Sequence, residues 1–123
     1  MGGRGTFAAG NSVAFNYETI GKIEGVKVLK GLNGLHKLPE EAHNSYAYIR
    51  LDHNGDFHEI RFYNKQHYLT HEIAYHSESS LDRTGKPVLH FHTYGPNFKR
   101  SKAKKATKAM KKHFRKYFKG VKI

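Results

Sequence analysis

Two histidines, His90 and His92, stand one residue apart in the stretch "PVLHFHTYG" of residues 87–95. The β-branched and aromatic residues of this stretch, ended by Gly95, predict a strand. Because side chains alternate across a strand, both imidazoles project from one face, while Leu89 and Phe91 project from the other. Two residues of strand advance about 6.6 Å, which places the imidazoles on either side of a group the size of a phosphate. That spacing suits an acid and a base.

Histidine has an ordinary pKa of about 6.5, so it both accepts and donates protons at neutral pH. A metal-independent ribonuclease needs a base, an acid and a cation that stabilises the charged phosphorane. In this chemistry Glu72 orients one ring and Arg61 or Arg50 supplies the cation. The predicted catalytic residues are His90, His92, Glu72, Arg61 and Tyr94. The plainer interpretation is an exposed polar strand face in a chain that has 10 histidines.

A metal site is the second interpretation of the paired histidines. A His-x-His pair on a strand supplies two ligands, and Glu72 or His76 could complete the set. The spacing fixes no third ligand, so we predict neither a bound metal nor a cofactor. His71 falls on the apolar side of its strand and is predicted to be a hydrogen-bonded core residue.

The positive charge is concentrated at the C-terminal end. The net charge is +12, and residues 83–123 hold 14 of the 22 Lys and Arg residues and none of the 10 Asp and Glu residues. This asymmetry favours a polyanion partner, and we predict nucleic acid, with RNA first. An anionic membrane or simple solubility would give the same charge, but no stretch reaches the roughly 18 apolar residues of a membrane span, so no membrane partner is predicted. The predicted nucleic-acid-binding residues are Lys99, Arg100, Lys102, Lys105, Lys108, Lys112, Arg115 and Lys116.

The elements that would position these residues are several strands followed by one helix. Residues 46–51, 57–63 and 68–76 predict three antiparallel strands, since the breaks between them carry turn residues. Residues 88–94 predict a further strand, and residues 22–30 a short strand with a glycine bend. From residue 101, apolar residues recur at steps of three and four, which predicts a basic helix over residues 101–119.

Together these elements predict an α+β fold, with an antiparallel sheet of about four to five strands and a basic C-terminal helix packed on one face. The glycine-rich residues 1–12 are expected to form a flexible arm, and residues 13–123 a single domain whose sheet spans about residues 22–95. Simple alternation turns Ile49, Ile60, Leu69 and Ile73 toward the core. A polar patch is expected on the other face, made of Glu59, Arg61, Glu72, His76, His90, His92 and Tyr94. One β-bulge would change part of this assignment.

Several motifs together resemble a known group of proteins. They are the opening "MGGRG", the predicted meander "AYIRLDHNGDFHEIRFYNKQHYLTHEIAYH", the strand "VLHFHTYG" and the basic helical end. The chain resembles small phage and prophage proteins grouped with the barnase/EndoU/colicin/RelE-like metal-independent ribonucleases. The resemblance covers most of the chain, and His90 and His92 match the His-x-His strand of that group. A further conserved histidine after that strand has no counterpart here.

The resemblance implies a small α+β domain whose exposed sheet face carries the active site. It implies a phage-encoded protein in the cytoplasm of an infected or prophage-carrying bacterium, which cleaves RNA phosphodiesters by histidine acid and base chemistry. The alternative is a non-catalytic phage accessory protein that binds nucleic acid, a phage structural protein or a host protein through its basic helix and polar sheet face.

Overall fold

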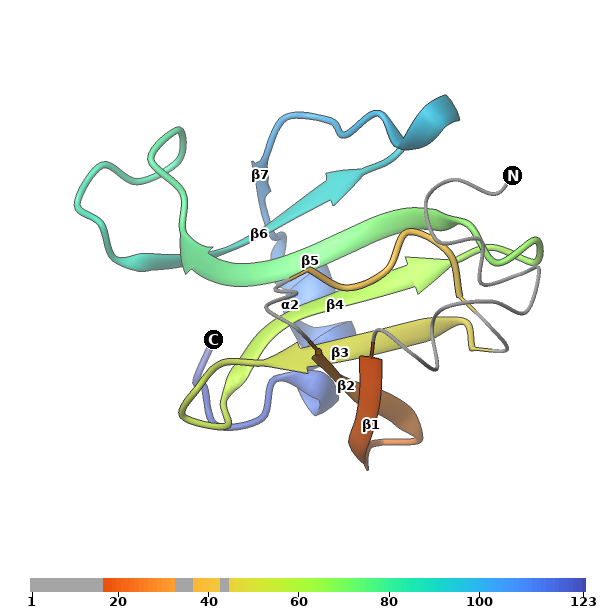
Figure 1. Ribbon diagram of the computed structural model, residues 1–123. Helices are drawn as coiled ribbons and strands as arrows, with labels where there is room; N and C mark the ends of the chain where they lie inside the picture. Colours follow the sequence, from red (N-terminus) through yellow and green to blue (C-terminus); the bar gives the residue numbers. More distant parts are fainter. Residues whose placement is uncertain (1–16, 33–36, 43–44) are drawn as a thin grey trace.

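A single sheet of seven strands dominates the fold (Figure 1). The computed structural model describes residues 17–32, 37–42 and 45–123. The strands are β1 Tyr17–Ile23, β2 Val26–Gly31, β3 Ala47–Leu51, β4 Phe57–Tyr63, β5 Leu69–Ser77, β6 Pro87–Thr93 and β7 Lys104–Lys105. They lie side by side in chain order. Strands β2 and β3 are parallel, and every other neighbouring pair is antiparallel.

The predicted antiparallel sheet of four to five strands is therefore wrong: the sheet has seven strands and is mixed. A tight turn at Glu24 and Gly25, with φ of 49° and 81°, divides the strand predicted over residues 22–30 into the β1–β2 hairpin. The two left-handed residues suit the twist of a two-residue hairpin. At the other end, Lys104 and Lys105 form β7 against β6. The predicted flexible arm, residues 1–12, lies outside the described residues.

The parallel pair requires the chain to cross over the sheet between β2 and β3. The described part of this crossover buries Leu38 and Ala42. These residues belong to a cluster that also contains Leu29, Tyr48, Tyr63 and Leu69. The crossover thus covers one end of the sheet face that carries the polar residues, which a simple antiparallel meander would have left open.

A short helix covers the opposite face of the sheet. Helix α2, Lys108–Phe114, continues into the 3-10 turn η3, Arg115–Tyr117, and Thr107 caps its start by accepting a 3.1 Å hydrogen bond from the Met110 amide. The helix is shorter than the predicted span of residues 101–119, since β7 occupies part of that span. No helix in the described part of the chain combines the length and the apolar character needed to cross a membrane.

The main core lies between this helical segment and the sheet. It contains the predicted inward residues Ile49, Ile60 and Ile73, together with Tyr117 and Phe118 from the C-terminal segment. We call this side of the sheet the helix face and the opposite side the histidine face. The basic helical segment packs on the helix face through its apolar residues.

Two β-bulges change the faces of individual residues. Between β3 and β4, Arg50 pairs with Glu59 and Leu51 pairs with Phe57, so His58 is the extra residue. Between β4 and β5, Phe62 pairs with His71 and Tyr63 pairs with Leu69. The second bulge moves Leu69 into the cluster beneath the crossover, so its predicted place in the main core is wrong.

Candidate functional site: a histidine and carboxylate cluster beside a basic cleft

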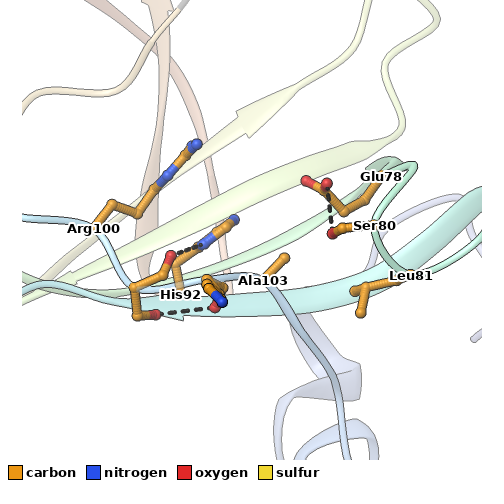
Figure 2. A pocket seen from close by; sticks show the side chains of 8 residues that line it. Glu78, Ser80, Leu81, His92, Arg100 and Ala103 are labelled. Carbon is orange, nitrogen blue, oxygen red and sulfur yellow. Dashed lines mark hydrogen bonds between the residues drawn. The ribbon is translucent and has the colours of Figure 1, made fainter.

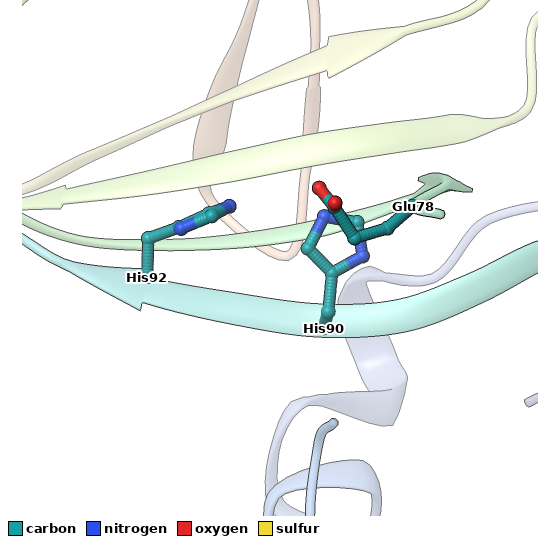
Figure 3. A group of neighbouring side chains, drawn as sticks. All are labelled: Glu78, His90 and His92. Atoms are coloured by element: carbon teal, nitrogen blue, oxygen red, sulfur yellow. The ribbon is translucent and has the colours of Figure 1, made fainter. Parts of the chain in front are cut away.

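His90 and His92 lie together on the histidine face of β6, as Figure 3 shows. The ring centroids are 5.5 Å apart with the ring planes nearly perpendicular. Both side chains are buried: His90 is 0% exposed and His92 is 4% exposed. The predicted common face is confirmed, but the rings are enclosed by the segments around them rather than displayed on an open sheet.

One backbone carbonyl fixes the position of the proton on each ring. Nδ1 of His90 lies 2.8 Å from the Val88 carbonyl, and Nδ1 of His92 lies 2.9 Å from the Ser101 carbonyl. A carbonyl oxygen only accepts, so Nδ1 carries the hydrogen and donates it in both rings. Each neutral ring therefore has its lone pair on Nε2, and that of His90 is buried without a hydrogen-bond partner among the described residues.

The chain brings Ser101 to His92 by a compact reversal after β6. The 3-10 turn η2, Pro96–Phe98, follows the strand, and the Gly95 amide donates a 2.9 Å bond to the Lys99 carbonyl. The Ser101 amide then donates to the Thr93 carbonyl at 2.8 Å. This pairing returns the chain alongside β6 and continues into β7.

A third residue, Glu78, joins the two histidines from the loop after β5. One ligand-type atom of each of Glu78, His90 and His92 lies within 4.8 Å of the other two. In Figure 3 the carboxylate of Glu78 lies over His90, and the outer nitrogen of each ring points toward it. The Ser80 hydroxyl donates a 2.9 Å hydrogen bond to this carboxylate, which lowers the pKa of Glu78. The charges of His90 and His92 lower this pKa further.

A cleft of about 510 Å³ opens beside this cluster (Figure 2). Both reactive side chains and cations line it: His92 and Glu78 belong to its wall, as do Arg100 and Lys102. The remaining lining residues are Ser80, Leu81, Ser101 and Ala103. The cleft thus offers an imidazole, a carboxylate and two cations to a bound group.

Arg61, the predicted catalytic cation, forms a buried ion pair with Glu72. Its Nε donates a 2.8 Å bond to Glu72, and a terminal nitrogen donates a 2.6 Å bond to the Leu38 carbonyl of the crossover. Burial raises the pKa of Glu72, but the charge and hydrogen bond of Arg61, together with Glu59 and His92, lower this pKa overall, so the carboxylate stays ionised. The ring of Tyr94 lies 5.7 Å from the Arg61 guanidinium carbon. Burial raises the pKa of Tyr94 to about 12, so its phenol stays protonated.

More imidazoles extend from the cluster across the histidine face. The rings of His90 and His76 lie 4.7 Å apart, and those of His76 and His58 lie 5.2 Å apart. Sequence alternation missed His58, because only the β3–β4 bulge turns it to this face. His71 is exposed beside Thr70 rather than buried, so its predicted place in the core is wrong.

The predicted nucleic-acid-binding residues divide between the two sides of the sheet. Arg100 and Lys102 line the cleft, and Lys99 and Lys105 are exposed in the same returning segment. The others are exposed on the helical segment that covers the helix face: Lys108, Lys112, Arg115 and Lys116. A single flat partner on the histidine face would meet the first group and not the second.

The fold and the site define an α+β-like protein with a mixed sheet, a cluster of two buried imidazoles and one partly exposed carboxylate, and an adjacent basic cleft. Comparison with family models, with curated proteins and with solved structures finds no match to this chain. The function is therefore argued from the site alone.

Proposed function

We propose that this protein binds RNA at the basic cleft and cleaves a phosphodiester positioned there. The observation that carries the proposal is the shared cleft of His92, Glu78, Arg100 and Lys102. Two cations at its wall suit the negative charge of a phosphate, and an unprotonated imidazole nitrogen suits the removal of a proton from a hydroxyl group.

His92 is the base in this proposal. Its Nδ1 hydrogen is held by the Ser101 carbonyl, which leaves the Nε2 lone pair to accept the proton of an RNA 2′-hydroxyl. The 2′-oxygen attacks phosphorus, the bond to the 5′-oxygen breaks, and the proton on His92 is returned to that leaving oxygen. The products are a 2′,3′-cyclic phosphate and a free 5′-hydroxyl. Arg100 stabilises the additional negative charge of the phosphorane.

His90 supports this site rather than supplying the acid. Its ring is fully enclosed, and burial lowers its pKa, with the neighbouring His76 and His92 acting in the same direction. A neutral, enclosed imidazole is a poor proton donor at neutral pH. The proposal therefore assigns both proton transfers to His92, which reaches the cleft.

Cleavage of a defined RNA in chelator tests the proposal. We expect the full chain to give products that end in a 2′,3′-cyclic phosphate, and to leave the same RNA uncut when one ribose lacks its 2′-hydroxyl at the target position. His92→Gln should lower the rate at least about 100-fold, as expected for loss of a general base. The matched control is His71→Gln, an exposed histidine on the same sheet. Equal rates for these two variants, or no cleavage by the native chain, would exclude the proposed reaction.

A second function, RNA binding without cleavage, is favoured by the enclosure of the cluster. With His90 at 0% and His92 at 4% exposure, little of either imidazole is open to a substrate, and His92 is the one that lines the cleft. Retention of RNA that weakens with added salt, without any product after prolonged incubation, would establish this second function.

A further inference from the structure

We propose that Nε2 of His90, Nε2 of His92 and the carboxylate of Glu78 bind one divalent transition-metal ion of the Zn²⁺ class. The proposal goes beyond the proposed function, because it rests on the ligand cluster and not on any reaction. Sequence spacing offered only two ligands, and the third comes from a loop that the fold returns over β6.

The arrangement of the three side chains is close to that of a metal site. Their ligand atoms lie within 4.8 Å of one another. A tetrahedral ion with bonds of about 2.1 Å holds its ligand atoms about 3.4 Å apart. No pair of ligand atoms then has to close by more than about 1.4 Å. Glu78 can supply its part of this movement because it lies on a loop and is only partly buried.

The hydrogen bonds of the two rings orient both imidazoles for metal binding. Histidine ligands of metals commonly donate their second ring N–H to a backbone carbonyl, which fixes the tautomer and orients the ring. Here the carbonyls of Val88 and Ser101 hold Nδ1 of His90 and His92 in this way. Both Nε2 lone pairs are left for a ligand.

An independent observation concerns Nε2 of His90. This nitrogen is fully buried and has no hydrogen-bond partner in the described part of the chain, and the whole His90 side chain is enclosed. A buried acceptor that lacks a partner costs about 1–3 kcal/mol. A metal ion between His90 and Glu78 would supply that partner.

Among the charged residues around the two histidines, Glu78 is the carboxylate placed to bind the metal ion. Glu72 lies across from His92 in the β5–β6 pair, but it is occupied by Arg61 at 2.8 Å. His76, whose ring lies 4.7 Å from that of His90, directs its own Nδ1 to the Ser77 carbonyl. Arg100 and Lys102 line the adjacent cleft.

Two imidazoles and one carboxylate select for a particular class of ion. Nitrogen ligands suit Zn²⁺ and its neighbours in the first transition series, whereas Mg²⁺ and Ca²⁺ prefer oxygen ligands alone. Three protein ligands leave a fourth position of a tetrahedral ion for water or for a group bound in the cleft.

Direct metal titration tests the site. The full chain, freed of metal by dialysis against a chelator, is titrated calorimetrically with Zn²⁺, and with Co²⁺ while the visible spectrum is recorded. We expect one ion per chain, the intense visible bands of tetrahedral Co²⁺, and no comparable heat with Mg²⁺. Glu78→Gln keeps the size of a partly exposed side chain and should weaken Zn²⁺ binding at least about tenfold, and His92→Gln should weaken it further.

The controls are the exposed histidines His71 and His113, each replaced by Gln. We expect less than about a twofold change for these variants, because they lie outside the cluster. In ¹⁵N spectra of the ring nitrogens, Zn²⁺ should shift Nε2 of His90 and His92 and leave both Nδ1 protonated. Equal weakening by all four variants, octahedral Co²⁺ spectra, or unshifted Nε2 signals would overturn the proposal.

One consequence rests on the proposed function. A metal ion on Nε2 of His92 occupies the lone pair that the proposed cleavage requires, so Zn²⁺ should inhibit cleavage and chelator should restore it. A chain that binds Zn²⁺ but cleaves no RNA even in chelator would refute the cleavage and leave the metal site intact. Cleavage without any Zn²⁺ binding would refute the metal site alone.

Discussion

Glu72 lies directly opposite His92 in the β5–β6 pair, but its carboxylate accepts a 2.8 Å hydrogen bond from Arg61 on the other neighbouring strand. Cross-strand neighbours on one face usually interact, and here the stronger charged partner on β4 takes the carboxylate. The pairing of Glu72 with Arg61 divides the histidine face into a structural part and a part that lines the cleft. Arg61 and Glu72 hold the crossover to the sheet, and His92 is left to Ser101 and the cleft.

Removal of Arg61 should destabilise the protein without a direct effect on the cleft. Arg61→Met leaves the carboxylate of Glu72 buried and without its charged partner, so the free energy of unfolding should fall by about 3–5 kcal/mol. The measurement is urea denaturation at neutral pH, with exposed Arg83→Met as the control. The double variant Arg61→Met with Glu72→Leu should recover part of the loss. A double variant that is no more stable than Arg61→Met would contradict this account.

Local sequence signals predicted the central strands well, for a physical reason. Strands β3 to β6 alternate apolar and polar residues, and their turns carry residues that stabilise reversal: the Asp52 side chain accepts hydrogen bonds from the amides of Asn54 and Asp56. The parallel pairing of β2 and β3 has no local signal, because it depends on a crossover that packs Leu38 and Ala42 over the sheet.

The candidate site was predicted only in part. The His-x-His spacing determined that His90 and His92 share a face, because that follows from the period of a strand. The approach of Glu78 and the position of His58 depend on a loop path and a bulge. The burial of His90 and His92 was not predicted for the same reason. The returning segment that carries Ser101 helps to enclose these two rings, which strand alternation alone would leave exposed.

His58 should make the stability depend on pH between neutrality and about pH 4. Burial lowers the pKa of His58 to about 4, and the charges of Arg50 and His76 act in the same direction, while Asp52 and Glu72 oppose them. The folded state thus binds this proton less tightly than the unfolded state, whose pKa is near 6.5. The stabilisation is fully present above pH 6.5 and is lost as the pH falls toward 4.

The measurement for His58 compares the urea midpoint at pH 7.5 and at pH 5 for the native chain and for His58→Gln. The native chain should lose more stability over this interval than the variant, since carboxylate titration is common to both. His53→Gln, an exposed histidine of the β3–β4 turn, serves as the control. Identical losses in the native chain and in His58→Gln would show that this imidazole does not titrate abnormally.

A side chain at Gly120 should cost more stability than one at another glycine with a positive φ. The φ of Gly120 is +77°, and an added Cβ would overlap the Asp56 carboxylate. Gly120→Ala should therefore lower the stability by more than Gly55→Ala, which has a φ of +82° and open space around it, and whose cost should be about 1 kcal/mol. Thermal denaturation measures both. Adding Asp56→Ala to Gly120→Ala should recover the extra loss of stability relative to Gly55→Ala. If it does not, the overlap with the Asp56 carboxylate is not the cause of that loss.

The two groups of cations should contribute unequally to RNA binding. A strand that enters the cleft passes Arg100 and Lys102, so replacing both by Ala should lower the slope of log affinity against log salt by about 1.4, at about 0.7 for each phosphate contact of a single strand. Replacing Lys108 and Lys112, which lie on the helix covering the opposite face, removes the same charge and should change the slope by less than half as much. Fluorescence anisotropy with a labelled single-stranded RNA at several salt concentrations gives both slopes. Equal slopes for the two double variants would mean that RNA is held by total charge, and that the cleft does not position it.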